Sequence, residues 1–180
     1  RRPRPWSVSE VRYLVESAGR VPKRDICRHL RRSSRSVECK AYHLRKEGVP
    51  VDLRHHEPRL SSCPACGRLS GRMGRDGFCE PCRRRAQLAE VHARIAELLA
   101  LLPPEERATY EATEAEVESR RDPMPPPPPT AGLSYYARAR AEEAHELACE
   151  EALTRNLMRE VKAAQKRKER VEKKVRSMRV

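Results

Sequence analysis

Four cysteines form two Cys-x-x-Cys pairs in the stretch CPACGRLSGRMGRDGFCEPC, with twelve residues between the pairs. A Cys-x-x-Cys pair folds into a tight turn that points both thiolates toward one centre. Two such pairs supply four soft ligands at tetrahedral geometry, which Zn²⁺ prefers in closed structural sites. The spacing therefore predicts one structural Zn²⁺ ion, bound by Cys63, Cys66, Cys79 and Cys82.

The residues between the two pairs include few apolar side chains, so a metal is expected to replace a hydrophobic core. Phe78 is expected to be the apolar plug of this small unit, and nearby arginines favour the thiolate form of the ligands. The stretch resembles a zinc ribbon or rubredoxin-like knuckle module, in which CPxCG opens the first knuckle. The resemblance covers residues 63–82 and implies metal binding. Modules of this kind bind DNA, RNA or protein, or stabilise a neighbouring domain.

Paired cysteines also serve redox chemistry, disulfide frames and iron sites. A thioredoxin-type redox pair lies in a βαβ context, which this sequence lacks. The seven cysteines are an odd number with clustered spacing, which indicates a cytosolic, metal-binding protein and argues against a secreted, cross-linked one. Iron bound by four thiolates is also possible. Electron transfer, the usual role of such an iron site, would be unusual beside the basic unit described below.

The enzymatic alternative is a nuclease, because His55-His56-Glu57-Pro58 precedes the cysteine pairs. HNH nucleases combine a histidine pair with Cys-x-x-Cys knuckles, but their first knuckle normally precedes the histidines, and an Asn and a further His follow. Here both knuckles follow, and the first downstream Asn is Asn156. No Ser/His/Asp set, Walker-type loop or pair of catalytic carboxylates is evident. We therefore expect a protein without enzymatic activity.

Positive charge is concentrated near the cysteine pairs and before them. The chain carries 39 basic and 26 acidic residues, a formal net charge of +13, and residues 1–60 alone contribute sixteen basic and seven acidic residues. This asymmetry is typical of a protein that binds a polyanion. No run of 18 apolar residues and no signal-peptide pattern is found, so no membrane association is expected.

Three short helices are expected over residues 6–48. Ser7 with Glu10 forms a capping-box pattern, which predicts a helix start, and Gly19 marks its end. A second helix is expected at about 23–31 and a third at about 34–46, ended by Gly48. On the third helix, apolar residues share one face, which predicts packing against the other two helices: Val37, Ala41 and Leu44.

The opposite face of the third helix combines cations with hydrogen-bonding and stacking groups, as a helix in the major groove of DNA requires. Hydroxyls, guanidinium groups and backbone N–H groups at its N-terminus can hold a phosphate. The expected DNA-contacting residues are Arg31, Arg32, Ser34, Arg35, Cys39, Tyr42, His43 and Lys46. Glu38 and Glu47 flank this face and are left out because they repel phosphate.

This unit resembles the Myb/SANT-like helix-turn-helix family, especially its bacterial and phage versions. Trp6, the run RDICRHLRRSSRSVECKAYHL and Gly48 carry the resemblance. Aliphatic Ile26 and Leu44 stand near the later tryptophan positions of the Myb pattern, as in bacterial relatives. The resemblance implies DNA binding through the third helix. The alternative is a three-helix bundle that binds protein, as some SANT domains do.

The whole chain is therefore expected to be mainly α-helical, with several segments. They are a helix-turn-helix bundle at 6–48, a linker at 49–62, a zinc ribbon at 63–82, amphipathic helices at 83–121, a Pro-rich linker at 122–133, and a long charged helix or coiled coil at 134–180. Residues 86–121 and 134–180 are expected to mediate self-association or to bind a protein partner.

These observations together predict a sequence-reading protein that binds double-stranded DNA. We expect a transcriptional regulator of a bacterium, phage or mobile element, associated with the nucleoid in the cytoplasm of a bacterium or of an infected host cell. The alternative is a DNA-packaging protein resembling a terminase small subunit, or a polymerase adaptor.

Overall fold

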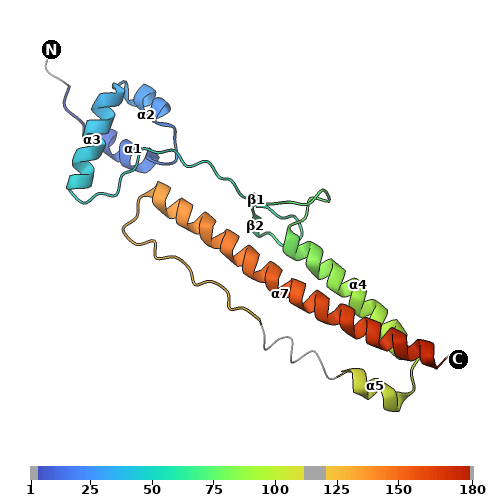
Figure 1. The fold of residues 1–180 in the computed structure, drawn as a ribbon. Helices are drawn as coiled ribbons and strands as arrows, with labels where there is room; N and C mark the ends of the chain where they lie inside the picture. Colours follow the sequence, from blue (N-terminus) through green and yellow to red (C-terminus); the bar gives the residue numbers. More distant parts are fainter. Residues whose placement is uncertain (1–3, 112–120, 179–180) are drawn as a thin grey trace. The chain divides into compact units, whose positions relative to one another are not determined.

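The computed structural model describes residues 4–111 and 121–178, and it confirms a mainly helical chain with one small two-stranded sheet in the described part. The chain forms two compact units (Figure 1). Unit 1 comprises residues 1–59 and 127–145, and unit 2 comprises residues 60–126 and 146–180. No helix in the described ranges is long and apolar enough to cross a bilayer.

Unit 1 begins with three helices: α1 (Val8–Ser17), α2 (Lys23–Leu30) and α3 (Ser34–Lys46). The capping box at the start of α1 is confirmed, because the Ser7 side chain accepts from Glu10 N and the Glu10 side chain accepts from Ser7 N. Gly19 follows α1 with a φ of +83°, a conformation that favours glycine. The expected bounds of α3 are also confirmed.

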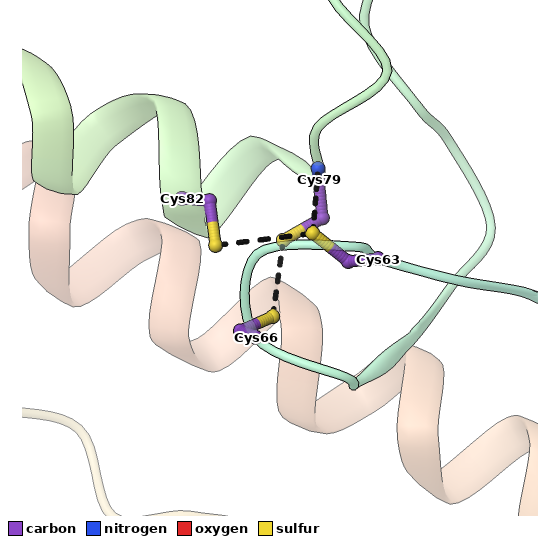
Figure 2. Close-up of side chains that lie close together, drawn as sticks. All are labelled: Cys63, Cys66, Cys79 and Cys82. Atoms are coloured by element: carbon purple, nitrogen blue, oxygen red, sulfur yellow. Dashed lines mark hydrogen bonds between the residues drawn. The ribbon is translucent and has the colours of Figure 1, made fainter.

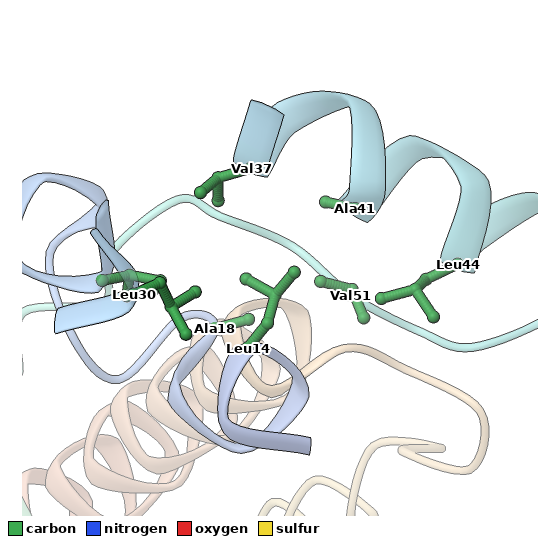
Figure 3. Packing of buried hydrophobic residues seen from close by; sticks show 8 residues of the cluster. Leu14, Ala18, Leu30, Val37, Ala41, Leu44 and Val51 are labelled. Atoms are coloured by element: carbon green, nitrogen blue, oxygen red, sulfur yellow. The ribbon is translucent and has the colours of Figure 1, made fainter. Parts of the chain in front are cut away.

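One face of α3 packs against α1 and α2 (Figure 3). Its buried side chains are the three that the sequence predicts: Val37, Ala41 and Leu44. They meet Leu14 of α1 and Ile26 of α2, both completely buried. A core this small depends on each of its members, because every buried aliphatic side chain removes a large part of the available apolar surface from water.

Arg32 belongs to this bundle rather than to its solvent-facing surface. Its side chain is only 6% exposed, and its guanidinium lies 4.2 Å from the centre of the Trp6 ring. The same group donates to Glu10 at 2.9 Å and to the carbonyl oxygens of Arg4 and Pro5. Arg32 therefore ties the segment before α1 to the turn between α2 and α3, and the expected DNA contact is replaced by a structural role.

Acidification is expected to weaken this network through Glu10. The hydrogen bond from Arg32 lowers the pKa of Glu10 from about 4.5 to about 2. A carboxyl with a lowered pKa stabilises the fold above its unfolded pKa and loses that contribution as the pH falls. The urea midpoint of the bundle, followed by the fluorescence of Trp6, should therefore fall between about pH 4.5 and pH 2. Glu10→Gln should flatten this pH dependence of the urea midpoint. Glu16→Gln removes an exposed carboxyl of α1 and should leave the pH dependence unchanged. Equal pH profiles for the two variants would contradict the role of Glu10.

The predicted linker at 49–62 is largely packed within unit 1. Val51 is a buried member of the bundle core, and the backbone N–H of His56 donates to the carbonyl of Gly19 at 2.8 Å. The His56 side chain is buried and lies 3.4 Å from Glu143, a residue of α7 (Tyr135–Ser177). The first turns of α7 thus belong to the N-terminal unit, which the sequence did not indicate.

Unit 2 contains β1 (Ser61–Ser62) and β2 (Leu69–Ser70), which pair antiparallel with Ser61 opposite Ser70. Two helices follow, α4 (Glu80–Ala100) and α5 (Pro104–Glu111), and the rest of α7 completes the unit. The expected continuation of the acidic helix to residue 121 falls mainly on residues 112–120, outside the described part of the chain. Residues 121–130, which include the proline run, form neither helix nor strand.

The apolar face of α4 packs against α7 within the same chain. Leu98 and Leu102 share a buried cluster with Val171 and Val175, and Leu99 and Tyr110 lie at its edge. These are residues of the two segments in which self-association was predicted. The four buried residues of this cluster therefore pack within unit 2.

Candidate metal centre and exposed face of helix α3

Each cysteine pair is positioned by a different kind of local structure (Figure 2). Cys63 follows β1, and Cys66 lies in the turn that leads to β2. Gly67 closes this turn with a φ of +70°, and its N–H donates to the carbonyl of Cys63 at 2.8 Å. The second pair lies at the start of α4, where Cys79 is the N-cap and Cys82 is in the first turn.

The four sulfur atoms lie close enough together to hold a metal ion. All four Sγ atoms are within 4.8 Å of one another. Two of the separations are 3.9 Å, from Cys63 to Cys82, and 3.7 Å, from Cys66 to Cys79. A tetrahedral site with Zn–S bonds of about 2.3 Å has sulfur–sulfur edges of about 3.8 Å, so the arrangement has the dimensions of such a site.

A disulfide frame does not fit these cysteines. A disulfide requires an S–S distance of about 2.05 Å, well below the separations given above. None of the seven cysteines, all of which lie in the described residues, is joined in a disulfide, and three of them lie outside the cluster: Cys27, Cys39 and Cys149. The cluster is therefore a set of four converging thiols, and its donor chemistry suits a soft or borderline metal ion.

The surroundings of the cysteines lower the pKa of Cys63 and raise the pKa of Cys79 and Cys82. The N–H of Cys79 donates to the Cys63 sulfur at 3.4 Å and is the main reason that the pKa of Cys63 is lowered to about 6. Burial raises the pKa of Cys79 to about 12, and burial also raises the pKa of Cys82. Charged thiolates at these buried and partly buried positions need a cation between them, which a bound metal ion supplies.

Two features of the cysteine module differ from the expected ribbon. The second pair opens a long helix instead of preceding one, so α4 begins at Glu80 rather than at residue 83. Phe78 is 40% exposed and does not act as an apolar plug. Pro81 in the first turn of α4 is the sequence signal that could have placed the helix start correctly, because proline is common there.

Glu150 of α7 holds the turn that follows β2. Its carboxylate accepts hydrogen bonds from the Ser70 hydroxyl and from the Gly71 N–H, the latter at 3.2 Å. A side chain at Gly71 would clash with Leu147. The module is therefore attached to α7 by a polar contact and by close packing, and neither was evident from the sequence.

Most of the predicted DNA-contacting residues are exposed on one side of α3, opposite its buried face. These are Arg35, Cys39, Tyr42, His43 and Lys46. The Lys46 ammonium lies 5.6 Å from the centre of the Tyr42 ring, and the rings of Tyr42 and His43 meet edge to face. The structure thus brings these five together, and none of the three basic residues is ion-paired to a carboxylate in the described part of the chain.

The N-terminal end of α3 differs in part from the expectation. Arg31 is exposed at the C-cap of α2 with a φ of 50°, while Arg32 is turned inward. Ser34 donates to Glu38, which also pairs with Lys23. The Lys23 ammonium lowers the pKa of Glu38 below its ordinary value. The negative charge of Glu38 is therefore compensated, and it opposes a phosphate less than the sequence suggested.

Comparison of the chain with protein-family models, with curated proteins and with solved structures finds no match.

Proposed function

We propose that the protein binds double-stranded DNA by placing the exposed face of α3 in the major groove. The supporting observation is that α3 buries one apolar face and presents a phenol, an imidazole and two cations on the other, and these cations pair with no carboxylate in the described residues. An α-helix is about 10–12 Å wide with its side chains, which matches a major groove about 12 Å wide. The three-helix bundle then holds α3 in position for contact with the bases.

The residues of this face have distinct proposed roles. Arg35 is suited to bidentate contact with a guanine, and Tyr42 and His43 supply hydrogen bonds and apolar contact to base edges. Lys46, eleven residues after Arg35, lies about 16 Å further along the helix and neutralises a phosphate there. Arg31 and the free N–H groups at the start of α3 hold a phosphate at the other end.

The cysteine module is proposed to hold one structural Zn²⁺, and the protein is proposed to have no catalytic activity of its own. The four ligands would fill a closed tetrahedral site, which supplies folding stability. The most suitable biological role is transcriptional regulation in a bacterium, phage or mobile element, with the metal module as a brace or as a second contact.

Selection of bound sequences from a random DNA pool by the full chain tests this proposal, and an enriched motif is the expected result. Arg35→Ala combined with Lys46→Ala should weaken binding to that motif by about tenfold or more and reduce the salt slope by about 1, because only Lys46 is assigned to a phosphate. Arg94→Ala removes one exposed cation of α4 and should have little effect. An unchanged affinity in the double variant would contradict the role of α3.

The packing of α4 on α7 argues against the alternative function as a ring-forming packaging protein. A ring-forming packaging protein needs an apolar interface between copies, whereas Leu98 and Leu102 are buried against α7 of their own chain. Light scattering distinguishes the two, since a ring supports packaging and a monomer or dimer supports regulation. A nuclease would show Mg²⁺-dependent cleavage that is lost in His56→Ala.

A further inference from the structure

The C-terminal part of α7 presents a row of cations to solvent. Within residues 162–176, successive cations of the row are four, four, three and three positions apart, and side chains at these spacings are neighbours on one helix face. We call this row the α7 stripe; it consists of Lys162, Lys166, Arg170, Lys173 and Arg176. Glu169 is the one other exposed residue of these fifteen. The solvent-facing surface of this stretch is therefore almost entirely cationic.

The stripe differs from three other basic residues of α7 in lacking acidic partners in the described part of the chain. Arg155 and Arg159 pair with Asp122 at 3.3 Å and 2.8 Å, and Lys174 pairs with Glu106 at 3.0 Å. No member of the stripe forms an ion pair with a carboxylate in residues 4–111 or 121–178. Like charges at these spacings repel one another and destabilise a helix, so the stability of α7 does not explain the first members of the row. Arg176 alone among them lies in the last turn of α7, where a cation is favourable.

The opposite face of the same stretch is already covered. Val171 and Val175 are buried in the cluster with Leu98 and Leu102. A helix that lies on a membrane inserts an exposed apolar face beneath the headgroups, and residues 162–176 expose no apolar side chain that could form such a face. The stripe therefore suits a water-soluble polyanion better than a lipid surface.

We propose that the α7 stripe binds the phosphate backbone of double-stranded DNA without reading its sequence. The row extends over about 21 Å of helix, and a duplex of that length carries about twelve phosphate charges. Each bound cation displaces a condensed counterion, so the stripe contributes affinity that falls as salt rises. The ligand is the same as in the proposed function of α3, but the inference rests on the α7 stripe, which belongs to unit 2, whereas α3 belongs to unit 1.

Neutralising the centre of the stripe tests this inference. In the full chain, Lys166→Gln, Arg170→Gln and Lys173→Gln together should weaken binding to a duplex of unselected sequence by about tenfold or more at 0.1 M salt, and should reduce the slope of log affinity against log salt by up to about 3. Glutamine keeps a helix propensity similar to that of lysine and arginine, so circular dichroism should be unchanged. The matched control neutralises three exposed arginines elsewhere: Arg12, Arg94 and Arg140.

A second variant should act in the opposite direction. Glu169→Gln removes the only exposed carboxylate from the face, and tighter binding with a steeper salt slope is expected. The inference is overturned if the stripe triple variant and the control triple variant have the same affinity and slope. It is also overturned if the stripe variant loses binding to phosphatidylcholine–phosphatidylserine vesicles but retains binding to DNA.

The failure of this inference and the failure of the α3 proposal give different results. If α3 reads DNA, the Arg35 and Lys46 double variant loses its preference for the selected motif but retains stripe-dependent binding to unselected duplex. If only the stripe binds DNA, no motif is enriched, the α3 variant resembles the parent chain, and the stripe variant alone loses affinity.

Discussion

A strong chelator is expected to unfold the cysteine module of unit 2 and to release about one metal ion per chain. The buried side chains of residues 63–82 are two of the cysteines, Cys63 and Cys79, together with Ser70 and Pro81. Cys66 and Cys82 are partly buried, and Leu69 and Phe78 are exposed. Metal ligation therefore takes the place of an apolar core. Structural Zn²⁺ contributes about 10–16 kcal/mol of apparent binding free energy at neutral pH, far more than any contact in this module.

Limited proteolysis and Trp6 fluorescence measure this effect in two places. Trypsin should cleave faster after exposed arginines of the module, such as Arg72 and Arg75, once the metal is removed. Trp6 is the only tryptophan of the chain and lies in the bundle of unit 1, so its emission should be unchanged. The expected result is thus local loss of structure with the N-terminal bundle intact.

Cysteine variants supply the matched control for metal removal. Cys63→Ser removes one ligand and should lower metal affinity and protease resistance, whereas Cys39→Ser changes an exposed thiol of α3 and should alter neither. Absence of bound metal from the purified parent chain, or equal proteolysis before and after chelation, would contradict a structural metal site. Measurement of the metal by mass spectrometry also decides between zinc and iron.

Arg32→Ala is expected to have the second large effect, a loss of stability in the three-helix bundle. The substitution leaves Glu10 without its buried partner and removes the cation from the face of Trp6. It also leaves the carbonyls of Arg4 and Pro5 without a donor. Breaking a largely buried ion pair is strongly destabilising, and the thermal midpoint should fall by roughly 10 °C or more.

Arg35→Ala is the control for Arg32→Ala, because both remove an arginine near the start of α3. Arg35 is exposed and unpaired in the described residues, so its removal should leave the thermal midpoint unchanged while weakening DNA binding. Arg32→Lys should give an intermediate midpoint, since lysine keeps the charge but lacks the planar fork that contacts Glu10 and Trp6 together. Equal midpoints for the two alanine variants would show that Arg32 is not structural.

Local patterns predicted the elements that depend on nearby residues. The capping box at Ser7, the bounds of α3 and its buried face follow from helix periodicity and end signals, which act over a few positions. The four converging cysteines follow from their spacing. In each case, the residues that determine the structure lie close together in the sequence.

Features that depend on distant residues were not predictable in this way. Arg31 and Arg32 are neighbours with the same chemistry, and only the position of Trp6 and Glu10 in the folded bundle decides that Arg32 turns inward. The packing of His56 against Glu143 joins residues far apart in the chain. No periodicity reports such a contact, because tertiary packing overrides the local composition that indicated a linker.

Cys79 is both the N-cap of α4 and a member of the cysteine cluster, and this combination affects the order of folding. It is the N-cap of α4, yet its side chain makes no capping hydrogen bond, and its sulfur faces the other three cysteines. Starting a helix is the unfavourable step, because several residues must be fixed before the first backbone hydrogen bond forms. Coordination of Cys79 and Cys82 by one ion would fix that first turn directly. The metal would then act as the nucleus of α4, and the supply of metal would set when the apolar face of α4 becomes available to pack on α7.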